Sequence, residues 1–333
     1  MVQLGISSVE SVLELLAGCT YRLDVPPEFV ARFFEDRRLI NELTRAHLEK
    51  ERKFADLLHG ATMQIELQLG THLFGFSTVE EHFALDSLVR VLKPRKIVEI
   101  GVFRGQTSLT MCRALSQSAG GGSLLGIDVD GAAVEIAREV LTACGLAPMF
   151  EFIAGHSNGI IHTVANADLI FIDGDHLFES AARDFVASYN ILGEGGVIAL
   201  HDVGSRVWGF HQGPGWLFHR VLPALLGDRI RQSALDSLCR ELTMRFLGPD
   251  SGATYRYCKS DEESRALARI TSADIIDGLG GMGVLVKLDG AHKLSLDEVL
   301  SLAPGPEPVA GGSTVRQPSR LGRAARKIAS WIP

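Results

Sequence analysis

The stretch Val98-Glu99-Ile100-Gly101-Val102-Phe103-Arg104-Gly105 decides the fold. An apolar run at residues 96–100 leads into it, and a helical pattern follows from Thr107. The two glycines predict a tight turn between a strand and a helix, where the absence of a Cβ lets the backbone approach a ligand. A dinucleotide fingerprint would instead need Gly-x-Gly-x-x-Gly after the first strand. The spacing here is Gly-x-x-x-Gly with an acid before it, which suits a positively charged nucleoside better than a pyrophosphate.

Outward from this turn, short apolar runs alternate with helical patterns. Such alternation predicts a parallel sheet covered by helices on both faces, with ligands bound at the carboxyl ends of the strands. The expected strands are 96–100, 124–128, 149–154, 169–173 and 197–202, and the expected helices are 107–115, 132–143, 157–164, 178–192 and 216–226. Two later strands, 254–259 and 282–287, are expected to close the sheet as a hairpin-like pair. The sequence therefore predicts an α/β fold with a doubly wound, mostly parallel seven-stranded sheet.

Three regions are expected along the chain. Residues 1–90 carry helical patterns at 28–59, after Pro26 and Pro27, and at 79–92, which predict an N-terminal cap or oligomerisation region. Whether it covers the site or joins subunits of a homo-oligomer is open at this point. Residues 91–302 form the sheet domain. Residues 303–333 combine a linker rich in Pro, Gly and Ser with a basic amphipathic tail.

The composition excludes several classes of protein. The net charge of −7 argues against a nucleic-acid partner, because phosphate-binding proteins are usually basic. The five scattered cysteines without CxxC spacing predict neither a disulfide framework nor a zinc site and fit a reducing cytoplasm. Neither a signal peptide nor a membrane span is indicated. The basic tail predicts weak binding to a membrane surface or a protein, with a disordered solubilising tail as the alternative.

A second acidic signal follows the turn, since Gly126-Ile127-Asp128 ends the next expected strand and a carboxylate there can accept both hydroxyls of a ribose. Together, Glu-x-Gly-x-x-x-Gly and Gly-Ile-Asp resemble motif I and the ribose-binding acid of class I S-adenosylmethionine-dependent methyltransferases, over roughly residues 75–290. The resemblance implies a Rossmann-like methyltransferase fold with S-adenosylmethionine as cofactor. It further implies that Glu99, Gly101 and Gly105 line the methionine part, that Asp128 holds the ribose, and that His156 and Ser157 lie where the family contacts adenine.

A third set of polar residues follows the fourth and fifth strands, at Asp173 and at His201-Asp202. These strands should be neighbours, so Asp173 and Asp202 should meet at the ligand edge. Two close carboxylates repel each other unless a cation lies between them, and a divalent cation with oxygen ligands meets that need. His201 either completes the site or faces away. As a ligand, it would shift the preference from magnesium towards manganese or another transition metal.

The residues Asp173-Gly174-Asp175-His176, followed later by His201-Asp202, resemble the metal-dependent small-molecule O-methyltransferases that include sugar and macrolide enzymes. Catechol-type relatives have Asp-Asn in place of His-Asp, so His201 departs from that pattern. The resemblance implies that His176 is the general base, and imidazole suits proton transfer near neutral pH. The alternative is that His176 caps the helix that follows. Asp175 is expected in a turn and Asp184 in a structural role, while residues 203–216 are expected to form a substrate loop or a hydrophobic lid.

The function expected from these patterns is a metal-assisted O-methyltransferase that acts on a hydroxyl of a sugar or sugar-bearing metabolite. The metal would be magnesium or manganese, and the protein would be cytoplasmic, with peripheral attachment at the inner membrane surface through its tail. One alternative is an NAD-dependent oxidoreductase, against which the missing Gly-x-Gly argues. The other is a non-catalytic S-adenosylmethionine-binding or membrane-associated adaptor, against which the Asp and His cluster argues.

Overall fold

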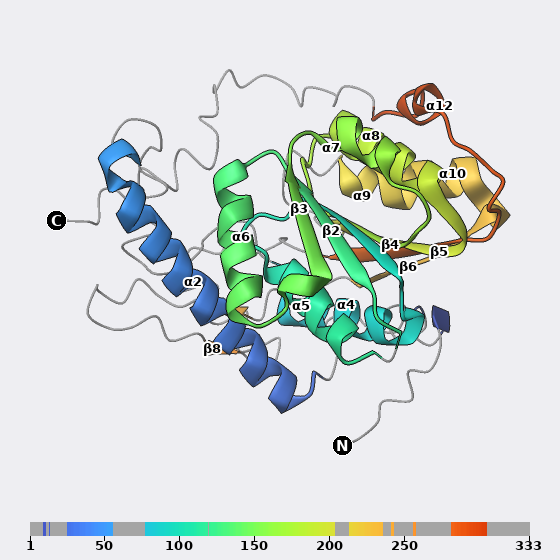
Figure 1. Ribbon diagram of the computed structural model, residues 1–333. Coiled ribbons are helices and arrows are strands. Elements are labelled where there is room, and N and C mark those ends of the chain that lie inside the picture. The colour runs from blue at the N-terminus through green and yellow to red at the C-terminus, as the bar shows by residue number, and fades with distance from the viewer. Residues whose placement is uncertain are drawn as a thin grey trace, which may run out of the picture.

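The computed structural model describes residues 25–55, 77–118, 120–203, 213–235 and 281–304, together with short pieces at 9–10, 13, 241–242 and 256–257. Figure 1 shows a twisted central sheet with helices on both sides. Residues 305–333, which hold nearly all of the expected linker and tail, lie outside the described residues, as do residues 204–212 of the expected substrate loop. No helix in the described part of the chain is both long and apolar enough to cross a membrane.

The sheet has seven strands in the order β3-β2-β1-β4-β5-β9-β6. Their bounds are β1 Lys96–Ile100, β2 Ser123–Asp128, β3 Phe150–Ala154, β4 Ala167–Ile172, β5 Leu192–His201, β6 Ile230–Leu235 and β9 Met282–Lys287. Strands β1 to β5 pair in parallel, and β9 is antiparallel to both β5 and β6. The predicted α/β fold with a doubly wound, mostly parallel seven-stranded sheet is confirmed.

The expected pairing at the end of the sheet is wrong. Strand β9 pairs with β5 and with β6, and β6 was not predicted. Within the other predicted strand, the described residues form β8 (Arg256–Tyr257), which pairs with β7 (Glu241–Leu242) in a separate two-stranded sheet. Strand β6 was not predicted because its residues, Ile-Arg-Gln-Ser-Ala-Leu, show little apolar pattern. An edge strand with a polar, exposed side often lacks such a pattern.

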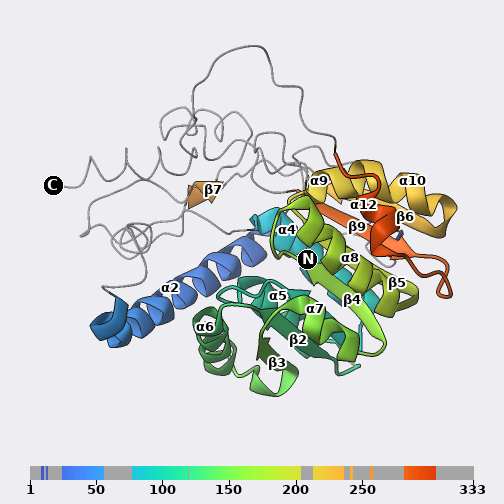
Figure 2. The ribbon, with the colours of Figure 1, turned by 90° about the horizontal axis from the view of Figure 1, so that it is seen from above.

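Helices cover the two faces in separate layers, as Figure 2 shows from above. One layer holds α4 (Val79–Leu92), α5 (Gln106–Ser116) and α6 (Gly131–Ala143), with α2 (Pro27–Ala55) packed across α5 and α6. The other holds α7 (Ser157–Ile160), η2 (Ile161–Thr163), α8 (Phe178–Ile191), the continuous segment α9 (Pro214–Trp216), η3 (Leu217–Val221) and α10 (Leu222–Leu226), and α12 (Leu296–Leu300). The N-terminal helices thus form part of the layer that covers the sheet.

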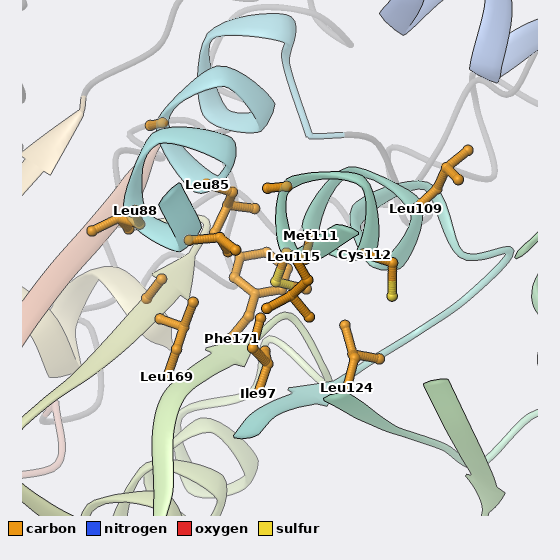
Figure 3. Close-up of a cluster of buried hydrophobic side chains, with 14 of the residues drawn as sticks. Leu85, Leu88, Ile97, Leu109, Met111, Cys112, Leu115, Leu124, Leu169 and Phe171 are labelled. Atoms are coloured by element: carbon orange, nitrogen blue, oxygen red, sulfur yellow. The ribbon is translucent and has the colours of Figure 1, made fainter. Parts of the chain in front are cut away.

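Strand alternation divides the core into two clusters. In β4, Leu169 and Phe171 point to the α4–α5 face, whereas Ile170 and Ile172 point to the α8 face. Figure 3 shows the first cluster, which includes Leu85, Leu88, Ile97, Leu109, Met111, Cys112, Leu115, Leu124, Leu169 and Phe171. Both faces of the parallel strands are therefore buried, which explains their nearly continuous apolar sequences.

Helix α4 begins with a capping box. The Thr78 hydroxyl accepts a hydrogen bond from the backbone N–H of Glu81, and the Glu81 carboxylate accepts one from the backbone N–H of Thr78. The helix is buried over Val79–Val89, and its charged residues Glu80 and Glu81 are at most 3% exposed. Buried carboxylates need hydrogen-bonding partners, so the first turn of α4 sits in a polar environment inside the protein.

Candidate active site

A cavity of about 930 Å³ opens at the carboxyl ends of β1 to β4. Its walls come from the loops after these strands, with Ile40 of α2 and His82 of α4 closing one side. The volume lies in the range of small-molecule and cofactor sites. Six of the site residues expected from the sequence line it: Gly101, Asp128, His156, Ser157, Asp173 and His176.

The two glycines of the first loop serve different purposes. Gly101 has φ +87°, and a Cβ there would lie 1.9 Å from the carbonyl oxygen of Asp173, so only glycine lets β1 and β4 end this close together. Gly105 has φ +81° at the start of α5, and a Cβ there would lie 2.8 Å from the Cβ of Ala137. Gly105 is not among the residues that line the cavity; it allows α5 to pack against α6.

The Asp128 carboxylate holds the glycine loop in place. Its Oδ2 accepts hydrogen bonds from the backbone N–H groups of Val102, at 2.9 Å, and Phe103, at 2.7 Å. Its Oδ1 accepts one from the backbone N–H of Asp130 at 2.9 Å. Asp128 also lines the cavity, and its Oδ1, which accepts one backbone hydrogen bond, has a further lone pair for a ligand hydroxyl.

Glu99 does not line the cavity. Position 99 of β1 points, like Ile97, towards the face covered by α5, and the side chain lies fully buried beneath the first turn of that helix. The hydroxyl groups of Thr107 and Ser108 donate hydrogen bonds to its carboxylate. Burial raises the pKa of Glu99 to about 8, and the two hydroxyl groups only partly oppose this. Because side chains alternate along β1, the Glu99 carboxylate points away from the expected methionine position and lies behind the wall of the cavity.

The loop after β3 contributes His156 and Ser157. His156 precedes α7, and both residues line the cavity. The Ser157 hydroxyl donates a hydrogen bond to Asp184 of α8, which is 7% exposed. Burial raises the pKa of Asp184, against the effect of that hydrogen bond. Asp184 therefore joins the β3 loop to α8, as its expected structural role implies.

Asp173, His201 and Asp202 come together where β4 and β5 end. Each offers a ligand atom, and these atoms lie within 4.8 Å of one another. The Nδ1 of His201 is 3.0 Å from Oδ1 of Asp173 and 3.4 Å from Oδ1 of Asp202. Asp202 has φ +58°, a left-handed conformation that costs energy for a residue with a Cβ and is common at functional sites. Two carboxylates and one imidazole form a donor set that fits a divalent cation.

The charges in this group support one another. Loss of solvent would raise the pKa of Asp173, but the attraction and hydrogen bond of His201, with the charge of His176, outweigh it and lower the pKa. Burial would likewise lower the pKa of His201, but Asp173, Asp202 and Glu81 raise it well above its usual value. The raised pKa of His201 favours its imidazolium form, whose positive charge opposes the repulsion between the two carboxylates.

His176 stands at the edge of this group. Its Nδ1 lies 3.2 Å from Oδ2 of Asp202, and its side chain is 46% exposed and lines the cavity. The N-cap residue of α8 is Leu177 and not His176, and the Leu177 side chain makes no capping hydrogen bond. Asp175 instead accepts hydrogen bonds from the backbone N–H of Leu177 and the hydroxyl of Ser180. The structure thus assigns the helix start to the Asp175 turn and leaves His176 facing the cavity.

Two residues of α4 were missed from the sequence. Oε2 of Glu81 lies 3.2 Å from Nε2 of His201, a contact between residues 120 positions apart. His82 lines the cavity, its Nδ1 is 2.7 Å from the Thr110 hydroxyl, and burial lowers its pKa to about 3, so the ring is neutral. The pattern Thr78-x-x-Glu81 is typical of a capping box, but such a pattern marks only a helix start and cannot reveal a contact with β5.

Comparison with known proteins adds an independent finding. Residues 98–203 match a family model described as a methyltransferase domain. Caffeoyl-CoA O-methyltransferase 2 of Petunia hybrida is 28% identical over 106 residues, 30% of this chain and 43% of the relative. An Arabidopsis thaliana protein named for the same activity is 27% identical over 146 residues, 42% of this chain and 53% of the relative. The chain thus spans about half the length of the curated relatives it matches.

Solved structures of similar proteins include two O-methyltransferases. TomG of Streptomyces achromogenes, involved in tomaymycin synthesis and solved with S-adenosylmethionine, is 18% identical, with coverage of 72% of this chain and 96% of that chain and a TM-score of 0.46. The Bacillus cereus enzyme, solved with S-adenosylhomocysteine, is 18% identical, with coverage of 72% and 97% and a TM-score of 0.45. Residues 98–203 are thus similar to a methyltransferase domain, and they hold the central parallel strands of the sheet.

The buried acid behind the cavity gives a prediction about pH. The pKa of Glu99 rises from its ordinary value of 4.5 to about 8 in the native protein, so between these values the native state binds a proton that the unfolded state has lost. The free energy of unfolding therefore falls as pH rises through this window. We expect Glu99→Gln to flatten this dependence, so that the wild type loses roughly 2–4 kcal/mol more than the variant between about pH 5 and 8.

Urea denaturation of the cofactor-free protein at several pH values measures this difference. Glu151→Gln, at an exposed position of β3, is the matched control and should keep the wild-type pH dependence. Parallel stability curves for the wild type and Glu99→Gln would contradict the prediction.

Proposed function

We propose that this chain transfers the methyl group of S-adenosylmethionine to a hydroxyl oxygen of a small molecule, assisted by a divalent cation. The observation that carries the proposal is the meeting of Asp173, His201 and Asp202, with His176 beside them, next to a cavity that Asp173 and His176 line together with Gly101 and Asp128. An adaptor without catalytic activity would have no need for this set of charged groups at the mouth of a cofactor cavity.

The cofactor is proposed to lie along the loops after β1, β2 and β3. Asp128 would accept hydrogen bonds from the ribose hydroxyls while it keeps its bonds to the backbone of Val102 and Phe103. His156 and Ser157 would contact the adenine. The methionine part would lie in the cavity beside Gly101 and Asp173, so that the methyl group points towards the end of β4.

Asp173, His201 and Asp202 would hold the divalent cation. A cation there supplies Lewis acidity that lowers the pKa of an acceptor hydroxyl and orients it. His176 would accept the hydroxyl proton. With Nδ1 turned to the Asp202 carboxylate, its Nε2 is the nitrogen available for that proton, and Asp202 stabilises the imidazolium that forms. The acceptor oxygen forms a bond to the methyl carbon as the carbon–sulfur bond breaks, and the sulfonium becomes a neutral thioether.

The acceptor class is proposed to be a sugar hydroxyl, on the strength of the Asp173-Gly174-Asp175-His176 and His201-Asp202 sequences. An aromatic hydroxyl is the second candidate, because the curated relatives are named for caffeoyl-CoA. A screen of methyl transfer from labelled S-adenosylmethionine to sugar-bearing metabolites and to catechol-type acceptors, with and without added Mg²⁺ or Mn²⁺, separates the two. Transfer to neither class would leave the proposed function without support.

Cofactor binding is expected to depend on Asp128. Asp128→Asn keeps an oxygen for the loop backbone but loses the charge, and a charged hydrogen bond contributes about 1.5–3 kcal/mol. We expect S-adenosylmethionine to bind at least roughly tenfold more weakly in calorimetry, since about 1.4 kcal/mol is a factor of ten. Asp130→Asn, which keeps an acceptor at the start of α6, is the control. Unchanged affinity in Asp128→Asn, or tight NAD binding by the wild type, would count against this cofactor.

Turnover is expected to require a divalent cation. Exhaustive chelation should abolish methyl transfer, and Mg²⁺ or Mn²⁺ should restore it. Asp202→Asn should lose turnover while S-adenosylmethionine affinity stays within about threefold, or about 0.7 kcal/mol, because the cation contacts the acceptor and not the sulfonium. Full activity in the chelated enzyme would refute metal assistance and favour a site in which the His201 imidazolium alone neutralises the carboxylates.

His176 is expected to act in the chemical step. His176→Ala should lower kcat by roughly 10²–10⁴-fold, the usual contribution of a general base, with little change in cofactor affinity. His162→Ala, at an exposed histidine of η2 outside the cavity wall, is the matched control and should keep wild-type kcat. Steady-state kinetics on the best acceptor from the screen decide the matter, and a wild-type kcat in His176→Ala would exclude the base role.

A further inference from the structure

Glu81 makes contacts that link three distant parts of the fold. Its Oε2 accepts a hydrogen bond from the backbone N–H of Thr78 at 2.6 Å and lies 3.2 Å from Nε2 of His201. Its Oε1 accepts a hydrogen bond from the backbone N–H of Gly281 at 2.5 Å. These partners belong to the start of α4, the end of β5 and the residue before β9. Glu81 lies outside the segment that matches the methyltransferase domain.

A capping box does not require this arrangement. It needs one contact from the carboxylate to the N-cap backbone, and such a residue usually lies at the surface with its other oxygen in water. The Glu81 side chain is instead fully buried, and its second oxygen accepts the hydrogen bond from Gly281, the residue before β9. Burying a carboxylate costs free energy unless its partners replace the lost hydrogen bonds to water. The contacts of Glu81 with Thr78, Gly281 and His201 provide this compensation.

The orientation of the His201 ring is the consequence that matters for function. Its two nitrogens face opposite ways, with Nδ1 towards Asp173 and Asp202 and Nε2 towards Glu81. A histidine that binds a metal through one nitrogen commonly donates the N–H of the other to a carboxylate, which fixes the tautomer and the ring and strengthens the ligand.

We propose that Glu81 is a positioning residue for the metal site: it accepts the Nε2–H of His201 and so directs the Nδ1 lone pair at the cation shared with Asp173 and Asp202. The inference rests on the proposed metal-assisted function. Glu81 itself contacts neither cofactor nor acceptor. Through it, the N-terminal helix α4 controls how tightly the cation is held.

The test measures Mn²⁺ affinity of the full chain by calorimetry, with S-adenosylmethionine affinity as the second readout. In Glu81→Gln, the amide group places a donor against Gly281 or against Thr78 and His201, so the ring loses its charged acceptor. We expect Mn²⁺ to bind roughly 10–100-fold more weakly, the usual effect of losing such a partner, with cofactor affinity within twofold of the wild type. Thr78→Val removes the cap hydroxyl but keeps Glu81, and should lower Tm without changing Mn²⁺ affinity.

A double-mutant cycle separates positioning from a general structural role. In the His201→Asn background, Glu81→Gln should have no further effect on Mn²⁺ affinity, because the ligand through which it acts is gone. An equal loss in both backgrounds, or wild-type Mn²⁺ affinity in Glu81→Gln, would overturn the inference while leaving the proposed function intact. A wild type without any Mn²⁺ affinity would overturn the metal-assisted function and the inference with it.

The wild type offers a further measurement that does not depend on how the variants fold. With ¹⁵N-labelled histidine and Zn²⁺ as a diamagnetic probe, NMR should show His201 protonated at Nε2 and metal-bound at Nδ1. The opposite tautomer would contradict the role of Glu81.

Discussion

The close approach of β1 and β4 at their carboxyl ends is the constraint on which the site depends. The backbone N–H of Asp173 donates a hydrogen bond to the carbonyl of Ile100 at 2.8 Å, and Gly101 turns away directly above it with no room for a side chain. The strand order changes direction between these two strands, where open α/β sheets have their ligand crevice. The glycine loop after β1 and the carboxylate of Asp173 are therefore held side by side at the ends of two paired strands.

The two faces of the sheet differ in what they bury. The face towards α8 encloses Lys287, whose Nζ donates hydrogen bonds to the carbonyls of Tyr189 and Leu192, whereas the face towards α4 and α5 encloses Glu81, His82 and Glu99. Each of these groups has a specific partner: Glu81 contacts Gly281 and His201, His82 contacts Thr110, and Glu99 contacts Thr107 and Ser108. Partly compensated polar groups near a ligand site cost stability and are typical of functional regions. The α4–α5 face therefore combines support of the fold with control of the site.

The sequence predicted the parallel part of the fold and most of the site because both depend on local signals. Apolar runs, glycine turns and the acids that end strands were enough to place Asp128, Asp173 and Asp202 at one edge. The course of β6 was missed because an edge strand with polar residues has little hydrophobic period. The position of Glu99 was misjudged for another reason: its neighbours in sequence line the cavity, but alternation along β1 turns its side chain to the other face. The role of Glu81 could not be predicted from the sequence, because its contact with His201 spans 120 positions and depends on how α4 packs.

The burial of α4 also bears on how the catalytic unit of this chain should be delimited. The family model matches residues 98–203, the part that holds the glycine loop, Asp128 and the cluster of Asp173, His201 and Asp202. Yet α4 lies outside that segment: its His82 lines the same cavity, and its Glu81, which also accepts a hydrogen bond from Gly281, contacts His201 of the cluster. A domain boundary placed at the ends of the matched segment would thus separate Glu81 and Gly281 from the residues that they contact. In this chain, the matched segment carries the clustered Asp and His side chains, and changes in the flanking sequence can alter their surroundings without replacing any of them.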